Sequence, residues 1–415
     1  MNGKWRHNTQ IQLLPHESRL RMNSFYISRL PRITYARGSI QQLPALMLAY
    51  GKEALLVTGN RSLRDSLHWQ GLLSDFKLHG IRCHELQVDG EPSPQLVDDS
   101  VQRFRSFAID VVIGIGGGSV LDAAKAIAGL LKPGNSVLDH LEGVGPELPY
   151  IGPSTPFIAV PTTAGTGSEA TKNAVLSTHG PHGYKKSFRD EQLVAEHALI
   201  DPDLFEQCPP ALIAANGMDA FTQLLESYVS SRANAFTDAL AWSGMAAASG
   251  ALLDWYENGA TATDAQAAMA YAALLSGITL AQVGLGSVHG LASPLGAFFP
   301  IPHGVVCGTL VAAATEINLH ALQQRQPASP ALFKYAQVGR LLAADYALDD
   351  QAAHNALLRI LSDWTARMQL PRLAHFGVTP ADFQRIVLNS RGSSMKTNPV
   401  ELSDAEIESI LRMRL

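Results

Sequence analysis

Asp110-Val-Val-Ile-Gly-Ile-Gly116-Gly117-Gly118-Ser119-Val-Leu-Asp122-Ala-Ala-Lys125 is the stretch that decides the fold. A continuous apolar run, as in a buried strand, enters three glycines and a serine, and an alanine-rich helical segment follows. Glycine lets the backbone approach a phosphate, and the helix N-terminus behind it offers free N–H groups to an anion. The stretch predicts a pyrophosphate-binding loop, although it matches neither G-x-G-x-x-G nor a P-loop, and a tight turn without a ligand is the alternative.

Further apolar runs surround this stretch on both sides. They lie at residues 53–59, 81–88 and 157–160, and helical segments separate them. Continuous apolar, β-branched runs of this kind are typical of parallel strands buried on both faces. The first half of the chain is therefore predicted to be an α/β domain with a parallel sheet.

The pattern changes near residue 200, where alanine, leucine and methionine at helical spacing replace the β-branched runs. The expected helices include residues 211–230, 234–253, 262–280 and 331–344. We therefore predict an N-terminal extension at 1–22, an α/β dinucleotide-binding domain at 23–200 and an all-helical metal and substrate domain at 201–415.

Composition excludes several classes of protein. With 415 residues, a net charge of −5 and 46% hydrophobic residues, the chain is globular and lacks the basic surface of a nucleic-acid binder. Its three cysteines, Cys83, Cys208 and Cys307, are too few and too scattered for a disulfide framework or a cysteine metal cage. No apolar segment predicts a membrane span or a signal peptide. A cytoplasmic location is expected.

A second glycine-containing loop follows the apolar run at 157–160. It reads Pro161-Thr162-Thr163-Ala164-Gly165-Thr166-Gly167-Ser168-Glu169, and its hydroxyl and N–H groups suit phosphate, ribose or amide recognition. The alternative is that Thr166 or Ser168 caps the next helix. Two such loops in one α/β half together favour a nucleotide site.

The end of the run at 53–59 bears on cofactor preference. An acidic residue at this place in dinucleotide enzymes holds the ribose 2′-hydroxyl, whereas an uncharged residue with a nearby arginine accommodates a 2′-phosphate. Gly59, followed by Asn60 and Arg61, occupies the place here, which favours NADP(H). The alternative is an ordinary surface helix start.

Three residues of the second half resemble a metal-ligand set. Asp219 lies in an apolar helical segment, where a carboxylate is costly to bury unless it is paired or bound to a cation. His289 is expected to end one helix and His303, behind Pro302, to start another. Asp, His and His form a three-ligand divalent site, and Gln223, one helical turn after Asp219, is a possible weak fourth donor. The alternative is a pair of ordinary buried histidines.

Taken together, these motifs resemble the iron-containing (group III) alcohol dehydrogenase family of the dehydroquinate synthase-like superfamily. The resemblance runs from about Phe25 nearly to the C-terminus. It depends on four segments: residues 116–125, 161–169, 216–220 and 289–304.

The resemblance implies NAD(P)-linked interconversion of a small alcohol and aldehyde in a cleft between the two domains, in an enzyme that is often a homodimer. It implies a divalent metal, iron or zinc, on Asp219, Gln223, His289 and His303. The expected catalytic residues are Asp219, His289, His303 and Ser293. The expected cofactor-binding residues are Gly59, Asn60, Arg61, Gly116, Gly117, Gly118, Ser119, Asp122, Thr162, Thr163, Thr166, Ser168 and Lys186.

Two departures from the family pattern affect the site. Gln223 stands where the family has a histidine ligand, and Ser293 stands where it has a histidine near the reacting centre. Loss of an imidazole should weaken binding of iron. Two other functions are therefore considered: a metal-independent keto-acid reductase resembling maleylacetate reductase, and a nucleotide-binding relative without catalysis.

Overall fold

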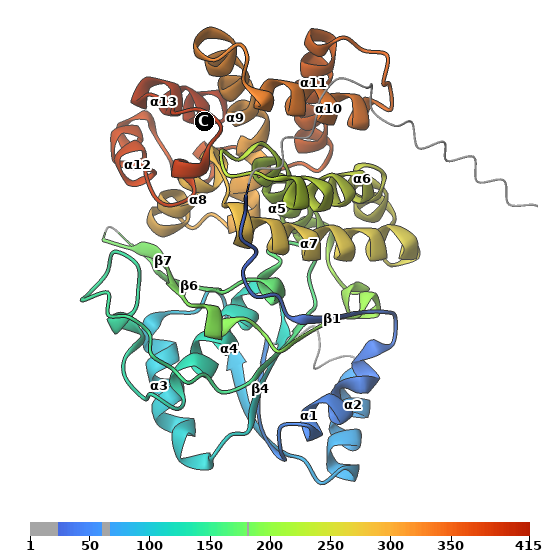
Figure 1. The fold of residues 1–415 in the computed structure, drawn as a ribbon, viewed down its shortest axis with the longest axis vertical. Helices are drawn as coiled ribbons and strands as arrows, with labels where there is room; N and C mark the ends of the chain where they lie inside the picture. The colour runs from blue at the N-terminus through green and yellow to red at the C-terminus, as the bar shows by residue number, and fades with distance from the viewer. Residues whose placement is uncertain (1–23, 60–66, 181) are drawn as a thin grey trace, which may run out of the picture.

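The computed structural model describes residues 24–59, 67–180 and 182–415, which form an α/β half followed by a helical half. In Figure 1 the α/β half occupies the lower part of the view and the helical half the upper part. The expected fold class is confirmed. The predicted extension at 1–22 lies outside the described residues, as do Asn60 and Arg61.

A six-stranded parallel sheet forms the centre of the first half, with the strand order β1-β8-β5-β4-β2-β3. Its strands are β1 (Arg32–Tyr35), β2 (Glu53–Gly59), β3 (Arg82–Val88), β4 (Val111–Gly116), β5 (Phe157–Pro161) and β8 (His197–Ile200). Along β4, Val112 packs into one hydrophobic core and Ile113 and Ile115 into another. Because both faces are covered, the strand is a continuous apolar run rather than an alternating one.

Helices cover the two faces of this sheet. They are α1 (Leu43–Leu48), α2 (Leu67–Leu78), α3 (Pro94–Phe104) and α4 (Gly118–Leu130). Trp69 and Phe76 of α2 share a core with Ile113, whereas Leu121 and Ile127 of α4 share the opposite core with Val112. The result is a doubly wound three-layer arrangement.

The strand order reverses direction at β2. The chain passes outward from β2 to β3 and then returns to place β4 on the other side of β2. Ligands of open α/β sheets bind outside the carboxyl ends of the strands at such a switch point. Gly59 at the end of β2 and Gly116 at the end of β4 flank it.

An antiparallel hairpin, β6 (Asn173–Thr178) and β7 (Tyr184–Arg189), stands outside the main sheet. β6 contacts α4, and β7 contacts α8 (Ser287–Phe298) of the helical half. The hairpin therefore joins the two halves, and it lies between them in Figure 1. Its mixed polar sequence did not predict strands.

Among the described residues, the second half consists mainly of helices. Besides α8 they are α5 (Pro210–Val229), α6 (Ala235–Asn258), α7 (Thr263–Val283), α9 (His303–Arg325), α10 (Pro330–Ala343), α11 (Asp350–Arg367), α12 (Phe383–Asn389) and α13 (Asp404–Met413). α5 packs against α6, α7 and α9. The helical segments expected from the sequence correspond to α5, α6, α7 and α10.

One helix boundary differs from expectation. His289 was expected to end a helix, but it lies in the first turn of α8, while α7 ends at Val283. Gly284, with a φ of 73°, stops α7 because its left-handed backbone cannot continue the helix. His303 begins α9 as expected.

Two of the described helices, α7 and α9, are long and apolar enough to cross a membrane. In the fold, 67% and 78% of their apolar windows are buried. Their apolar surface is covered by neighbouring helices of the same half, as in the core helices of a folded domain.

Candidate metal and cofactor site

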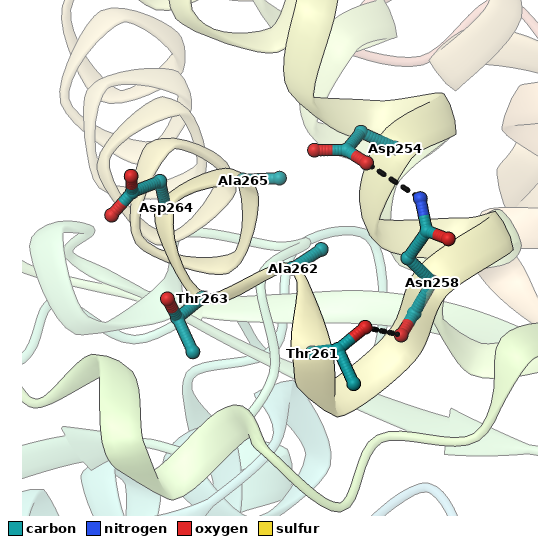
Figure 2. A pocket seen from close by; sticks show the side chains of 7 residues that line it. All are labelled: Asp254, Asn258, Thr261, Ala262, Thr263, Asp264 and Ala265. Atoms are coloured by element: carbon teal, nitrogen blue, oxygen red, sulfur yellow. Dashed lines mark hydrogen bonds between the residues drawn. The ribbon is translucent and has the colours of Figure 1, made fainter.

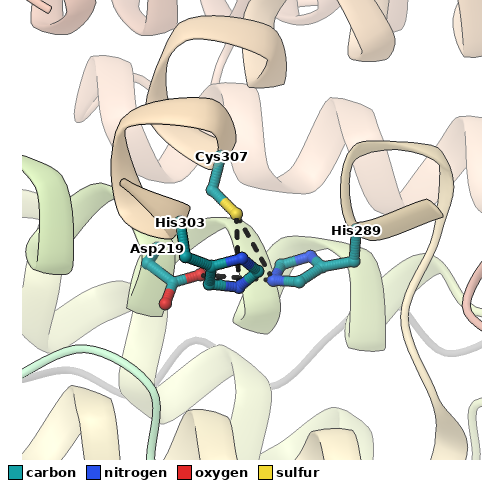
Figure 3. A group of neighbouring side chains, drawn as sticks. All are labelled: Asp219, His289, His303 and Cys307. Carbon is teal, nitrogen blue, oxygen red and sulfur yellow. Dashed lines mark hydrogen bonds and ion pairs between the residues drawn. The ribbon is translucent and has the colours of Figure 1, made fainter. Parts of the chain in front are cut away.

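Four side chains from three helices of the second half converge on one point, as Figure 3 shows. Asp219 comes from the middle of α5, His289 from the first turn of α8, and His303 from the first residue of α9. Cys307 follows His303 by one helical turn, so both side chains lie on the same side of α9. The structure therefore brings together the three ligands that the sequence predicted and adds a thiol.

The donor atoms of this group are close to one another. Asp219 Oδ1 lies 3.2 Å from His289 Nε2 and 3.7 Å from His303 Nε2. Cys307 Sγ lies 3.5 Å from His289 Nε2 and 3.8 Å from His303 Nε2. One ligand atom from each of the four residues lies within 4.8 Å of all the others, which is compact enough for a single cation.

The burial of Asp219 fits a bound cation. Its side chain is 1% exposed, and among the described residues Oδ2 has no hydrogen-bond partner. A buried carboxylate oxygen without a partner is costly unless a positive charge compensates it. His303 is more open, with 26% of its side chain exposed, which leaves one side of the group accessible.

Glu226, two helical turns after Asp219 on α5, supports the group from behind. One of its carboxylate oxygens lies 2.7 Å from His289 Nδ1, and the other accepts the backbone N–H of Val288 at 2.7 Å. This contact orients the ring so that Nε2 faces Asp219. Carboxylates commonly hold metal-binding histidines in this way.

The ionisation of Asp219 and His303 suits a cation, whereas Cys307, Asp219 and Glu226 raise the pKa of His289 against the effect of burial. Although burial opposes its ionisation, His303 and His289 hold the pKa of Asp219 below its usual range. Burial and the nearby Lys185 ammonium lower the pKa of His303 to about 4, against the opposing effect of Asp219. His303 is therefore neutral near pH 7, which is the form of histidine that binds metals.

Gln223 is buried one turn after Asp219, next to α7. Its Oε1 lies 2.9 Å from the hydroxyl of Ser276, and that hydroxyl lies 3.4 Å from the carbonyl oxygen of Gly165. The single proton of that hydroxyl also has the Ala273 carbonyl oxygen within reach at 2.8 Å, so the contact places Gln223 beside α7 near the loop at 162–168. Its proposed role as a weak fourth ligand stays a prediction.

The two glycine-containing loops meet where β4 and β5 end side by side. A Cβ atom on Gly118 would lie 2.7 Å from Thr166, and one on Gly117 would lie 3.2 Å from Thr163. The backbone N–H of Thr162 donates to the carbonyl oxygen of Gly116 at 3.0 Å. Glycine is favoured at 118 because a Cβ would clash with Thr166, whereas a Cβ at 117 would be a tight contact with Thr163.

The N-terminus of α4 faces the carboxyl end of the sheet. Gly117 is the N-cap residue, no side chain caps the helix, and Ser119 lies in its first turn, half-buried. This arrangement presents backbone N–H groups at the switch point, as an anion site requires. The predicted pyrophosphate position of residues 116–119 thus has a suitable geometry.

Two of the predicted cofactor-binding residues take part in an internal network. Ser168 donates to Asp122 Oδ1 at 2.5 Å, and Asp122 Oδ2 accepts the backbone N–H of Val175 at 3.2 Å. The buried ammonium of Lys125 donates to both the hydroxyl and the carbonyl oxygen of Ser168. In this structure Asp122 and Ser168 therefore hold the second loop against α4.

The remaining predicted residues occupy the boundary between the halves. The Ser293 hydroxyl donates to the backbone carbonyl of Lys185 at 3.1 Å, which ties α8 to β7. Lys185 forms a 2.5 Å ion pair with Glu91 and lies beside α8, whereas Lys186 approaches Gly143. Adjacent residues of a strand point to opposite faces, so Lys185 rather than Lys186 is directed toward α8.

A separate polar pocket lies on the surface where α6 meets α7, and it has a volume of about 300 Å³ (Figure 2). Its lining residues are Asp254, Asn258, Thr261, Ala262, Thr263, Asp264 and Ala265. Asn258 donates to Asp254 at 2.7 Å, and its carbonyl oxygen accepts the Thr261 hydroxyl. None of these residues belongs to the metal-ligand group or to the glycine loops.

Sequence reasoning missed Cys307 and Glu226. Both carried a signal: Cys307 is four residues after His303, and Glu226 is seven residues after Asp219, so each shares a helix face with a predicted ligand. The expectation that three scattered cysteines cannot form a cysteine metal cage considered cysteines alone. The fold brings one of them among histidines and a carboxylate.

Comparisons with known proteins agree over most of the chain. The family model described as iron-containing alcohol dehydrogenase matches residues 31–202, and the model of the C-terminal part of that family matches residues 213–415.

Individual relatives cover similar lengths. Alcohol dehydrogenase 4 of Schizosaccharomyces pombe is 33% identical over 78% of this chain and 73% of its own. The NADPH-dependent butanol dehydrogenase of Clostridium saccharobutylicum is 28% identical over 92% of this chain and 96% of its own. A crystal structure of 1,3-propanediol oxidoreductase, 27% identical, superposes with a TM-score of 0.85 over 95% of this chain and all of that chain.

Proposed function

Because the chain belongs to the iron-containing alcohol dehydrogenase family, we propose that it catalyses reversible hydride transfer between a small alcohol and a nicotinamide cofactor. Alcohol and oxidised cofactor give aldehyde, reduced cofactor and a proton. A nicotinamide cofactor held by the glycine loops would supply C4 of its ring as the acceptor of the hydride from the carbon that bears the hydroxyl group.

The observation that carries this proposal is the contact between the second glycine loop and the helix that bears Asp219. A Cβ on Gly165 would lie 2.7 Å from the side chain of Asn216, which is one turn before Asp219 on α5. Gly167 approaches the backbone of Gly277 on α7 just as closely. These contacts support the proposal that the candidate cofactor loop and the metal-ligand group belong to one site.

We propose that Asp219, His289 and His303 hold a divalent cation, iron or zinc. When bound, the cation supplies a positive charge that stabilises negative charge on the substrate oxygen. Asp219 contributes a buried anionic ligand, and Glu226 keeps Nε2 of His289 directed into the group. The more exposed His303 borders the side from which a substrate can approach.

For the cofactor, the proposed position of the pyrophosphate is residues 116–119, with the nicotinamide ring near 162–168. NADP(H) is proposed over NAD(H) because Gly59, at the end of the neighbouring strand β2, carries no carboxylate to repel a 2′-phosphate.

The proton that the alcohol loses on oxidation follows a different route from the one that a histidine at position 293 would provide. The Ser293 hydroxyl already donates to Lys185, so its own proton is engaged. Water or a ribose hydroxyl of the cofactor can accept the proton of the alcohol instead, and Ser293 then serves to hold α8 on β7.

The metal-independent alternative and the non-catalytic alternative are less well supported. The unpartnered, buried oxygen of Asp219 fits a cation-dependent enzyme better than one that relies on hydrogen bonds alone. The relatives described above are named for dehydrogenase or oxidoreductase activity.

The proposed activity is tested by following NADPH oxidation with a panel of small aldehydes. The variant Asp219→Ala should lose at least about 100-fold in kcat/KM, because charge stabilisation by a metal is worth several kcal/mol. Asp254→Ala, at an exposed aspartate outside the site, is the matched control and should be unaffected. Equal activity of Asp219→Ala and the parent protein would refute the proposed site.

We further propose that the protein is a cytoplasmic homodimer. Its cysteines are free, as expected in a reducing compartment. Phe25, Tyr26 and Ile33, at and before the edge strand β1, are exposed and offer apolar surface for association. Sedimentation equilibrium should give twice the chain mass, and a single-chain mass would contradict the proposal.

A further inference from the structure

We propose that Cys307 is the fourth protein ligand of the cation, in the place of the family imidazole that Gln223 has replaced, and that the site therefore selects Zn²⁺ over Fe²⁺. The inference rests on the proposed metal-dependent function. It concerns the composition of the ligand set, which neither the family match nor the relatives' names describe.

Four of the six separations between donor atoms are close to those of a tetrahedral site, and all six are within 4.8 Å. Ligand atoms about 2.0–2.3 Å from a zinc ion at tetrahedral angles lie roughly 3.3–3.8 Å apart. Four separations are 3.2 and 3.7 Å from Asp219 Oδ1 to His289 and His303, and 3.5 and 3.8 Å from Cys307 Sγ to the same two imidazoles. The Cys307 sulfur is therefore positioned as one of the donor atoms of the group and not as an outer contact.

Gln223 is poorly suited to be the fourth ligand. Its Oε1 lies within hydrogen-bonding distance of the Ser276 hydroxyl, in the direction of α7 and the loop at 162–168. A neutral amide is also a weaker ligand than a thiolate for zinc. Cys307 is completely buried and has no disulfide partner, so its sulfur is available to a cation.

Binding by Cys307 changes the charge of the site. The thiol loses its proton to solvent when the sulfur–metal bond forms, and no electron is transferred. A divalent cation with one carboxylate and one thiolate has a formal charge of zero, whereas one carboxylate and three neutral imidazoles leave a charge of +1. A neutral ligand set costs less desolvation free energy to bury than a charged one. A soft sulfur ligand also favours zinc over iron.

Cobalt provides a test that does not depend on enzyme activity. The purified full-length protein is stripped of metal, loaded with Co²⁺ and examined by absorption spectroscopy. The parent protein should show a thiolate-to-cobalt charge-transfer band in the near ultraviolet. Cys307→Ser should lose the band, and Cys208→Ser, at the half-buried cysteine beside Thr162, should keep it.

Competition between Zn²⁺ and Fe²⁺ provides the second measurement. Cys307→Ser should weaken zinc binding by more than the 10–100-fold that loss of an outer contact causes. The double variant Gln223→His with Cys307→Ser should restore binding without the charge-transfer band. If Cys307→Ser fails to fold, the cobalt spectrum of the parent protein still decides whether Cys307 binds the metal.

The outcomes separate this inference from the proposed function. Stoichiometric cobalt in the parent protein without the charge-transfer band would overturn the role of Cys307 and leave the metal-dependent dehydrogenase intact. Failure to bind any metal, with full activity after exhaustive chelation, would overturn both. A preference for Fe²⁺ in the parent protein would overturn the predicted selectivity.

Discussion

Glu226 acts on the candidate metal site through His289 and not directly. The two carboxylate oxygens of Glu226 face two donors, the His289 ring and the Val288 N–H. The variant Glu226→Gln keeps the size of the side chain but has only one acceptor oxygen for these two donors. Metal affinity should fall about 10–100-fold, as is usual when a ligand loses its supporting carboxylate.

A chromophoric chelator measures this loss by competition for the metal. Glu316→Gln is the matched control, because Glu316 is exposed on α9. If Glu226→Gln binds metal as tightly as the parent protein, the contact with His289 has only a structural role.

Gly59 is the residue at which cofactor preference can be changed. Among the described residues, a Cβ there would meet Val120 Cγ2 at an ordinary contact distance of 3.7 Å, so a side chain can begin there without a clash with them. Gly59→Asp should repel the 2′-phosphate and bind the 2′-hydroxyl, reversing the preference from NADPH to NADH.

The ratio of kcat/KM for the two cofactors measures the change, and Gly250→Asp, exposed on α6, controls for the added charge. An unchanged ratio in Gly59→Asp would show that the end of β2 does not contact the adenosine ribose.

At the scale of the structural elements, one buried lysine holds the glycine-containing loop at 162–168 against α4. The Lys125 ammonium is completely buried and donates to Ser168, Thr171 and the carbonyl oxygen of Asn173, at 2.6–3.0 Å. Lys125→Met removes these bonds and leaves Asp122 buried without its cation, which should destabilise the protein by about 3–5 kcal/mol.

Urea unfolding monitored by circular dichroism measures this change in the free energy of unfolding. Lys132→Met, one residue beyond the cap of α4 and exposed, should change it by less than about 0.5 kcal/mol. A similar small effect for Lys125→Met would mean that the loop is held by other contacts.

At the scale of the whole molecule, the candidate ligands come from three helices, α5, α8 and α9, so a bound cation joins them. Loading with Zn²⁺ at 100 times the Kd should add about 2.7 kcal/mol to the stability of the folded state. For a helical half of this size, the Tm should rise by roughly 5–10 °C.

Scanning calorimetry of chelated and metal-loaded protein measures this difference, and the shift should disappear in Asp219→Ala. Coincident melting curves for the chelated and the loaded parent protein would contradict a metal bound across these helices.

The sequence predicted the parts of the fold that depend on local pattern. Continuous apolar runs indicated β2 to β5, and alanine-rich periodicity indicated α5, α6, α7 and α10. β1, β8 and the hairpin of β6 and β7 were not predicted, because their short or half-exposed sequences lack a clear period.

The sequence by itself determined the family, the glycine loops and the three residues Asp219, His289 and His303, because these are motifs of fixed local spacing. Only the tertiary structure placed Cys307 among them, engaged Gln223 with Ser276, and directed Lys185 toward α8. Such contacts join residues tens of positions apart, and their distances depend on how α5, α8 and α9 pack. Local spacing specifies which helix face a residue occupies, but only the packing of the helices decides which residues that face contacts.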